Sequence, residues 1–219
     1  MTKERPILFS APMVRALLDG SKTQTRRIVK PQPIGEMCFE SGPPDYKNVY
    51  AILNDEKRIP CPYGQPGDRL WVKEAHYSFG HWVRDGLTKA GKPKWKFVRD
   101  SKETLFQPPE GWLSHRAKSS PKIPAWYKRS SLFLPRWASR ITLEITGVRV
   151  EQLQDIHHNK ADLLAEGITL PPSELYQDIN TSDKLERQYT KLWESINGTG
   201  SWDKNPWVWV IEFKGGRKQ

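Results

Sequence analysis

The sequence predicts an α+β fold in which a few short helices flank a curved or closed β-sheet. The run 141–150 alternates apolar and polar residues, and its apolar phase shifts by one residue at Gly147. Such a shift at a glycine is typical of a β-bulge, which bends a strand as a small barrel requires. The run 207–213 is apolar on both faces, as expected of a central strand. Between these runs, 183–196 carries its apolar residues on one helical stripe.

The N-terminal third predicts a helix followed by a strand. The helix covers 10–19, with Pro12 in its first turn, where a missing N–H costs nothing. Gly20 stands at the C-cap position, where a left-handed backbone favours glycine. The strand covers 23–29, so its odd-numbered and even-numbered side chains face opposite ways. A solvated edge strand is the alternative interpretation of this polar run.

The next segment, 31–62, is rich in proline and glycine and predicts irregular structure with one short strand near 49–53. Pro66 and Gly67 then fit the centre of a type II turn. The strand that follows, 69–74, directs Glu74 to the same face as two apolar residues. A carboxylate facing inward needs a cationic or hydrogen-bonding partner.

The positive charge of the chain is concentrated in one segment. Residues 81–140 contain 14 Lys and Arg against 4 Asp and Glu, which accounts for the whole net charge of +10. We expect 78–132 to be a basic, aromatic-rich insertion, formed by one hairpin and a long loop, in a single domain 1–219. This composition favours an anionic partner, most often nucleic acid. Its aromatic residues suit base stacking or equally a small local core, and a solubilising loop is the alternative for its charge.

Towards the C-terminus, a short helix over 158–166 ends at Gly167, and the helix over 183–196 ends at Asn197 and Gly198. The dipeptide Asn205-Pro206 precedes the final strand, as is common at the opening of a turn.

Several functional classes are not supported by the composition. No apolar run is long enough to span a membrane, and the first residues lack the apolar core of a signal peptide. Cys38 and Cys61 are too few for a disulfide framework, so we expect reduced thiols in a cytoplasmic protein. The histidines and cysteines lack paired metal-ligand spacing, and His157 and His158 are adjacent. We therefore expect no metal and no cofactor. Nothing in the sequence specifies an oligomeric state.

Five motifs together resemble the ASCH family, whose fold is a PUA-like β-barrel, and most closely its longer phage and prophage members. They are Gly20-Ser-Lys-Thr-Gln-Thr-Arg-Arg27, Gly67-Asp-Arg-Leu-Trp-Val-Lys-Glu74, Pro135-Arg-Trp-Ala-Ser-Arg140, Ala165-Glu-Gly-Ile168 and Asn205-Pro-Trp-Val-Trp209. The resemblance implies a small curved β-barrel with short flanking helices. The basic insertion is the least matched part.

The resemblance also implies a function on RNA or modified nucleosides. A small member group hydrolyses N-acetylcytidine with a lysine, a threonine and a glutamate, which match Lys22, Thr25 and Glu166 here. Other members act as ribonucleases. We therefore expect a metal-independent hydrolase, with a non-catalytic RNA- or nucleotide-binding module, such as a phage factor acting on host RNA, as the alternative. This chain departs from the small hydrolases in its length, its basic insertion and the His157-His158 pair.

The proposed catalytic pair makes chemical sense but has a geometric difficulty. A lysine of lowered pKa can take a proton from a hydroxyl, and the oxygen can then attack a carbonyl. On an ideal strand, however, Lys22 and Thr25 would face opposite ways, so the turn after Gly20 would have to bring them together. Lys22 could instead only bind phosphate, and Glu166 could be an ordinary residue in the last turn of a helix.

Further residues are candidates for binding nucleic acid or substrate. Guanidinium groups suit phosphate and an indole offers a stacking face, although Trp137 could equally belong to a core and the arginines to its rim. Glu74 could bridge to Arg26 or Arg140, and Asn205 could read a base edge or only open a turn. The full set of candidates is Arg26, Arg27, Glu74, Arg136, Trp137, Arg140, Asn205 and Trp207.

Overall fold

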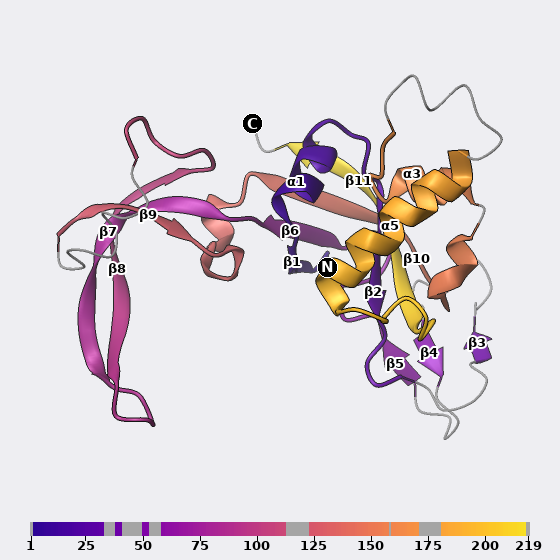
Figure 1. Cartoon of the computed structure of the whole chain (residues 1–219), viewed down its shortest axis with the longest axis horizontal. Coiled ribbons are helices and arrows are strands. Elements are labelled where there is room, and N and C mark those ends of the chain that lie inside the picture. Colours follow the sequence, from indigo (N-terminus) through magenta and orange to yellow (C-terminus); the bar gives the residue numbers. More distant parts are fainter. Residues whose placement is uncertain are drawn as a thin grey trace. The chain divides into compact units, whose positions relative to one another are not determined.

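The chain forms two compact units with mostly β-structure and few helices, which confirms the α+β class (Figure 1). The computed structural model describes residues 2–32, 38–40, 50–52, 58–112, 123–157, 159–170 and 181–217. The first unit comprises 1–7, 12–71 and 140–219, and the second comprises 8–11 and 72–139. The predicted insertion 78–132 falls within the second unit.

A five-stranded sheet forms the framework of the first unit. Its strands lie in the order β1 (Glu4–Leu8), β6 (Arg69–Lys73), β10 (Ile141–Gln152), β11 (Trp207–Arg217) and β2 (Gln24–Ile28) (Figure 1). The long strands β10 and β11 pair antiparallel along their whole length. Val208 through Ile211 are almost completely buried, so the prediction of a central strand, apolar on both faces, is confirmed.

The predicted bulge is present in β10, where the register with β11 shifts between Ile145 and Gly147. The φ of Gly147 lies outside the left-handed region, so its backbone conformation does not by itself favour glycine, and the space around it is the remaining reason. A Cβ at this position would lie 2.6 Å from Oε2 of Glu212, its partner across the ladder. The glycine therefore leaves room for a carboxylate that pairs with Arg149.

The helices match the predicted segments closely. They are α1 (Ala11–Leu18), α3 (Lys160–Ala165) and α5 (Thr181–Asn197), and the predicted start of α3 at His158 lies outside the described residues. A short 3-10 helix, η3 (Leu153–Ile156), precedes α3. Apolar side chains from η3, α3, α5 and β11, together with three from the segments that follow α3 and α5, build one core. Its residues are Leu153, Ile156, Leu163, Ile168, Leu170, Leu185, Tyr189, Trp193, Trp202, Val208 and Val210.

The prediction for 31–62 was incomplete. The expected strand is β4 (Tyr50–Ile52), with Val49 and Leu53 outside the described residues. Two further strands, β3 (Cys38–Glu40) and β5 (Arg58–Pro60), pair with it on either side. Strands of three residues are too short to show a period of two in the sequence.

The second unit contains a three-stranded sheet in the order β8 (Pro93–Leu105), β7 (His76–Leu87) and β9 (Ala125–Arg129). The predicted hairpin is therefore present as β7 and β8 (Figure 1), but the segment expected to be loop contributes a third strand. Its sequence, Ala-Trp-Tyr-Lys-Arg, does not alternate apolar and polar residues, so it gave no strand signal. Two 3-10 turns follow, η1 (Ser131–Phe133) and η2 (Arg136–Ala138). Across the described parts of both units, no helix is long and apolar enough to cross a membrane.

We predict that Gly147→Ala displaces the Glu212 carboxylate and costs about 0.5–1.5 kcal/mol of unfolding free energy, the range of a partly exposed ion pair with local strain. Because the loss would act through Glu212, adding Gly147→Ala to Glu212→Gln should cost much less than the sum of the two single changes. Urea unfolding of the four proteins measures this coupling. Full additivity would contradict the spatial role of Gly147.

We also predict that His76 makes the second unit less stable in acid. Burial, with the charges of Arg99, Arg129 and Lys73 acting in the same direction, lowers the pKa of His76 from 6.5 to about 4. The unfolded chain binds this proton at a higher pH than the folded chain, so stability should fall as the pH decreases from 6.5 towards 4. His76→Asn retains an N–H near the Glu74 carbonyl but does not titrate. Its urea midpoint should therefore depend less on pH than the wild-type midpoint, and equal dependence would contradict the prediction.

Candidate functional site

Lys22 is placed by the turn that ends α1. Gly20 has a φ of +81°, which confirms the predicted left-handed position and reverses the chain before β2. The Lys22 N–H then donates to the Ala16 carbonyl at 3.0 Å. Lys22 and Glu166 form an isolated antiparallel bridge, and the Thr23 N–H donates to the Ala165 carbonyl at 2.9 Å. Backbone hydrogen bonds therefore fix the start of β2 against the end of α3.

Glu166 is the C-terminal cap of α3, and the glycine after it allows the close approach to Lys22. Gly167 has a φ of +79°. A Cβ at this position would lie 3.0 Å from both the Ala16 Cβ and the Lys22 Cβ. Backbone conformation and space therefore both require glycine here. The helix end predicted at this glycine is confirmed.

The Glu166 carboxylate lies between two buried cations. The Nζ of Lys22 donates to Oε2 of Glu166 at 2.8 Å and to its backbone oxygen at 2.7 Å. The Nη1 of Arg26 donates to Oε1 at 3.1 Å. The side chains of Lys22 and Glu166 are only 2% and 4% exposed. The structure therefore brings together two of the three predicted catalytic residues.

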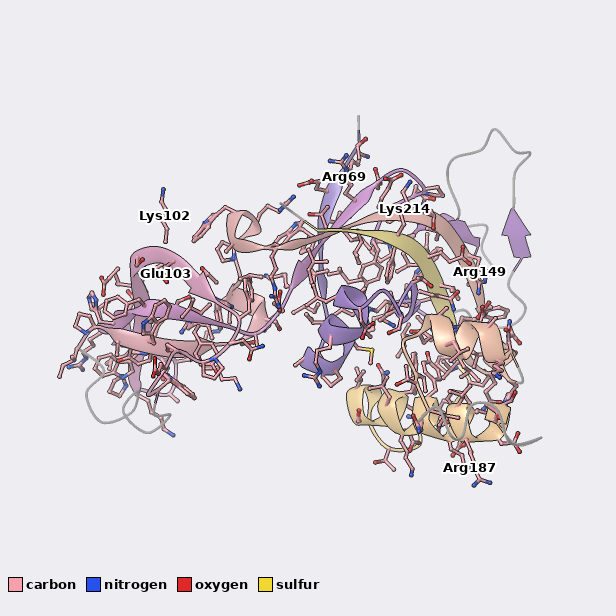
Figure 2. The ribbon with its side chains drawn as sticks, turned by 90° about the horizontal axis from the view of Figure 1, so that it is seen from above. Arg69, Lys102, Glu103, Arg149, Arg187 and Lys214 are labelled. Atoms are coloured by element: carbon pink, nitrogen blue, oxygen red, sulfur yellow. The ribbon has the colours of Figure 1, made fainter. Side chains whose placement is uncertain are left out.

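A chain of ion pairs connects this buried centre with the surface. Glu151 and Asp162 both accept hydrogen bonds from Arg26, and both also accept from Arg149. Arg149 in turn pairs with Glu212. The Arg149 and Glu212 side chains are 37% and 45% exposed, so the chain runs from a dry interior to solvent. Figure 2 labels Arg149 beside α3, the helix that carries Asp162.

The electrostatics of the centre bear on proton transfer. Burial lowers the pKa of Lys22, and the adjacent Glu166 carboxylate opposes this effect. Arg26 stays protonated, because the charges of Glu166 and Glu151 outweigh the effect of burial and raise its pKa. Burial, followed by the charge of Glu166, raises the pKa of Tyr189 on α5. The centre therefore combines a fixed guanidinium, a carboxylate and a lysine whose neutral form is favoured by burial.

Thr25 is separated from Lys22 by the alternation of the strand. Gln24 and Arg26 both reach the ion-pair chain, Gln24 through a hydrogen bond from Arg149 at 3.2 Å. Thr25 lies between them in β2, is buried, and is paired with Ile211 of β11. Its side chain therefore points to the opposite face of the strand, and so does that of Arg27, which is half-buried.

Asn205 and Trp207 have structural contacts. Asn205 has a φ of +41°, and its Oδ1 accepts a hydrogen bond from the Gln154 N–H at 2.8 Å. Its Nδ2 donates to Oε1 of Gln152 at 3.4 Å. The half-buried Trp207 exchanges backbone hydrogen bonds with the side chain of Gln32. These contacts fix the start of β11, and they occupy the Asn205 carboxamide that was a candidate for reading a base edge.

The other predicted binding residues are distributed over both units. Glu74 is buried in the second unit, as its inward-facing position predicted. Arg26, in the first unit, has three other carboxylates as its partners. Arg136 and Trp137 lie on η2, where Trp137 is half exposed and the Arg99 guanidinium lies 5.1 Å from its ring centroid. Arg140 is half-buried in the first unit.

Four residues of the ion-pair chain were not predicted from the sequence. They come from three elements, with Arg149 and Glu151 on β10, Asp162 on α3 and Glu212 on β11. The one signal in the sequence was the alternation that places Gln24 and Arg26 on the same face of β2, since a buried arginine on that face needs acidic partners. In the described ranges, no group of three or more His, Cys, Asp or Glu side chains is placed to hold a metal ion.

Comparison with known proteins provides no identification. No family model, no curated protein and no solved structure matches this chain.

The two arginines of the ion-pair chain allow a matched test of burial. We predict that Arg26→Met lowers the free energy of unfolding by about 3–5 kcal/mol, because it leaves the buried Glu166 without one of its two cations. Arg149→Met removes a cation from the same Glu151 and Asp162, but it should cost about 1 kcal/mol or less because Arg149 is partly solvated. Urea unfolding measures both values. Equal losses would show that burial does not determine the strength of this network.

Proposed function

We propose that this chain is an RNA- or nucleoside-binding protein of the ASCH type, and that Lys22 and Glu166 form the acid–base pair of a metal-independent hydrolase. One observation carries the proposal. A lysine whose pKa is lowered by burial donates to a buried carboxylate at 2.8 Å, at two positions that the family resemblance independently assigns to catalysis.

The pair can move a proton without a metal ion. A neutral Lys22 amine accepts a proton from a nucleophilic hydroxyl or water, which makes that oxygen able to attack a carbonyl or a phosphodiester. The ammonium that results is stabilised by the Glu166 carboxylate, which Arg26 holds in place. It returns the proton to the leaving nitrogen or oxygen as the C–N or P–O bond breaks, which regenerates the neutral amine. Arg26 does not exchange protons itself, since a guanidinium stays protonated.

Thr25 is the residue whose role changes in this proposal. The resemblance implies that its hydroxyl is the nucleophile, but the strand directs it away from the face that carries Gln24 and Arg26. A bound water, or the 2′-hydroxyl of RNA, reaches Lys22 without that constraint. We therefore assign Thr25 a supporting position in the sheet and assign the nucleophile to water or substrate.

The RNA part of the proposal is supported by the second unit. The charge excess of the chain lies within residues 81–140, and most of that range belongs to this unit. Aromatic and cationic side chains are interleaved there, a combination that suits single-stranded nucleic acid. Nucleic acid bound in this way releases counterions, so its affinity should fall steeply with salt.

A PUA-like barrel remains our proposal for the fold of the first unit. The five-stranded order leaves β1 and β2 as the outer strands among those described, and the bulge in β10 supplies the bend that closure would need. The motifs that carry the resemblance lie on β2, β6, η2, the end of α3 and the start of β11.

A second candidate function is supported by the burial of the centre. The side chains of Lys22, Arg26 and Glu166 are at most 4% exposed, so substrate reaches them only if neighbouring groups move. A non-catalytic RNA-binding module needs no such movement. The ion pairs would then only stabilise the packing of β2 against α3.

Turnover assays on variants of Lys22 and Thr25 distinguish these candidates. We predict that purified protein turns over labelled RNA or N-acetylcytidine equally well with and without EDTA. Lys22→Arg should lose turnover while keeping most of the ligand affinity, because it keeps the charge and cannot accept a proton. Thr25→Val should keep turnover if water or substrate supplies the nucleophile, and lose it if Thr25 does.

The pH dependence provides a further control on the same assay. The neutral form of Lys22 increases with pH, so the rate should rise and then level off below the ordinary lysine value of 10.5. Wild-type protein that binds a ligand tightly but turns over neither substrate would favour the binding module.

A further inference from the structure

One face of the three-stranded sheet in the second unit gathers cations and hydrogen-bonding groups. His76 of β7 is paired with Arg129 of β9, and Ser78 of β7 is paired with Thr104 of β8. Residues directly opposite each other on neighbouring strands present their side chains to the same face. The Arg99 Nη1 donates to Oγ1 of Thr104 at 3.0 Å, which places Arg99 with the same group.

The two arginines of this face have aromatic neighbours instead of acidic ones. The Arg129 guanidinium lies 4.8, 4.3 and 4.6 Å from the ring centroids of Trp82, Phe97 and Phe133. Arg99 lies over the Trp137 ring. Within the described part of the chain, neither guanidinium has a carboxylate partner. A guanidinium stacked on a ring keeps the N–H donors along its edge available for an anion.

The electrostatics of these groups agree with the lack of a carboxylate partner among the described residues. Burial lowers the pKa of Arg129, and the charge of Arg99 lowers it further. The same two cations add to the effect of burial on His76. In the first unit, by contrast, every buried cation of the ion-pair chain has a carboxylate within hydrogen-bonding distance. Among the described residues, no carboxylate offsets the positive charge of this face of the second unit.

Two buried polar atoms on the same face also lack a partner. Among the residues that the structure describes, neither the Ser78 Oγ nor the His76 Nε2 has a hydrogen-bond partner, although both side chains are completely buried. Burying a hydroxyl without a partner is costly, so such a group indicates a missing ligand or water. Because Ser78 is completely buried, its hydroxyl can donate to an anion that the two arginines hold only when the side chains that cover it move. This observation is independent of the charge.

Exposed aromatic rings border the cations. Phe133 and Trp137 are 60% and 51% exposed, and they lie on the 3-10 turns η1 and η2. Each ring has a guanidinium against it. An exposed ring next to a phosphate-binding guanidinium is the arrangement by which proteins bind an unpaired nucleotide, with the base stacked and the phosphate paired.

We propose that this face of the second unit binds single-stranded RNA, with Arg99, Arg129 and Ser78 receiving a phosphate and with Phe133 and Trp137 stacking bases. A single strand fits because the bases of a duplex are already stacked and do not expose their faces. The site deepens the RNA-binding part of the proposed function and rests on it, because it names the residues of the second unit that would hold the strand. It uses none of the residues around Lys22, so it does not depend on whether the protein is a hydrolase.

The test is fluorescence anisotropy with the full chain and a labelled single-stranded oligouridylate of about 10 nucleotides, within the usual range of single-strand site sizes. Trp137→Ala should weaken binding about fivefold or more, the effect of losing one stacked base. Arg129→Gln and Arg99→Gln should each weaken binding about tenfold and reduce the salt slope by about 1.

Because Arg129 packs on three rings, circular dichroism is needed to show that Arg129→Gln is still folded. Trp137 is half exposed and lies outside the sheet, so Trp137→Ala tests the site without disturbing the sheet.

Matched controls separate this site from other sources of binding. Arg84→Ala removes the same charge from an exposed position on β7 and should change the affinity less than twofold, apart from the general salt effect. An abasic oligonucleotide should lose its sensitivity to Trp137→Ala but keep its sensitivity to Arg129→Gln. Lys102 on β8 points away from the sheet (Figure 2), so Lys102→Ala should resemble Arg84→Ala.

Three results would overturn the proposal. The first is unchanged affinity in folded Trp137→Ala and Arg129→Gln proteins. The second is loss of affinity that is equal in Arg84→Ala and Arg129→Gln, which would indicate only diffuse charge. The third is displacement of the oligonucleotide by millimolar inorganic phosphate together with equal binding of the abasic strand, which would assign the site to free phosphate. Lys22→Arg should leave binding here intact, so a failure of the hydrolase proposal can be distinguished from a failure of this one.

Discussion

The Glu166 carboxylate, held between Lys22 and Arg26, is the interaction on which the candidate site depends. A buried charge is costly unless it is paired and hydrogen-bonded, and this carboxylate has a cation on each oxygen. The contact also joins the start of β2 to the end of α3. Without these two cations, the Glu166 carboxylate at the end of α3 would be a buried charge with no compensation, so the local fold and the site depend on the same contacts.

The two units differ in how their cationic side chains are compensated, and this difference favours a different role for each unit. In the first unit, cations and carboxylates alternate from Lys22 out to Glu212, so the charge is compensated along the whole path. Compensated buried groups can exchange a proton or stiffen a fold, but they have little attraction left for an anion. In the second unit, Arg99 and Arg129 have aromatic neighbours and no acidic ones among the described residues, so their attraction for an anion is retained.

The elements of the fold were largely predictable because local patterns specify them. The glycines at 20, 67 and 167 mark left-handed positions that other residues rarely adopt, and all three have positive φ. The phase shift at Gly147 indicated the bulge for a related reason, since a one-residue slip moves every later side chain to the other face. Strands β3, β5 and β9 escaped prediction. β3 and β5 have three residues each, too few for a period of two, and β9 has three apolar or aromatic residues followed by two cations instead of an alternation.

The sequence by itself determined which residues of the N-terminal run share a face and where the positive charge of the chain is concentrated. It also suggested, through resemblance alone, that Lys22 and Glu166 belong together. Only the tertiary structure decided that they touch, that the turn after Gly20 does not bring Thr25 to the face of Gln24 and Arg26, and that Arg149, Glu151 and Glu212 complete the network. The physical reason is that these contacts, some of them between residues more than 100 positions apart, depend on sheet register and on the end of a helix. No local pattern encodes those distances.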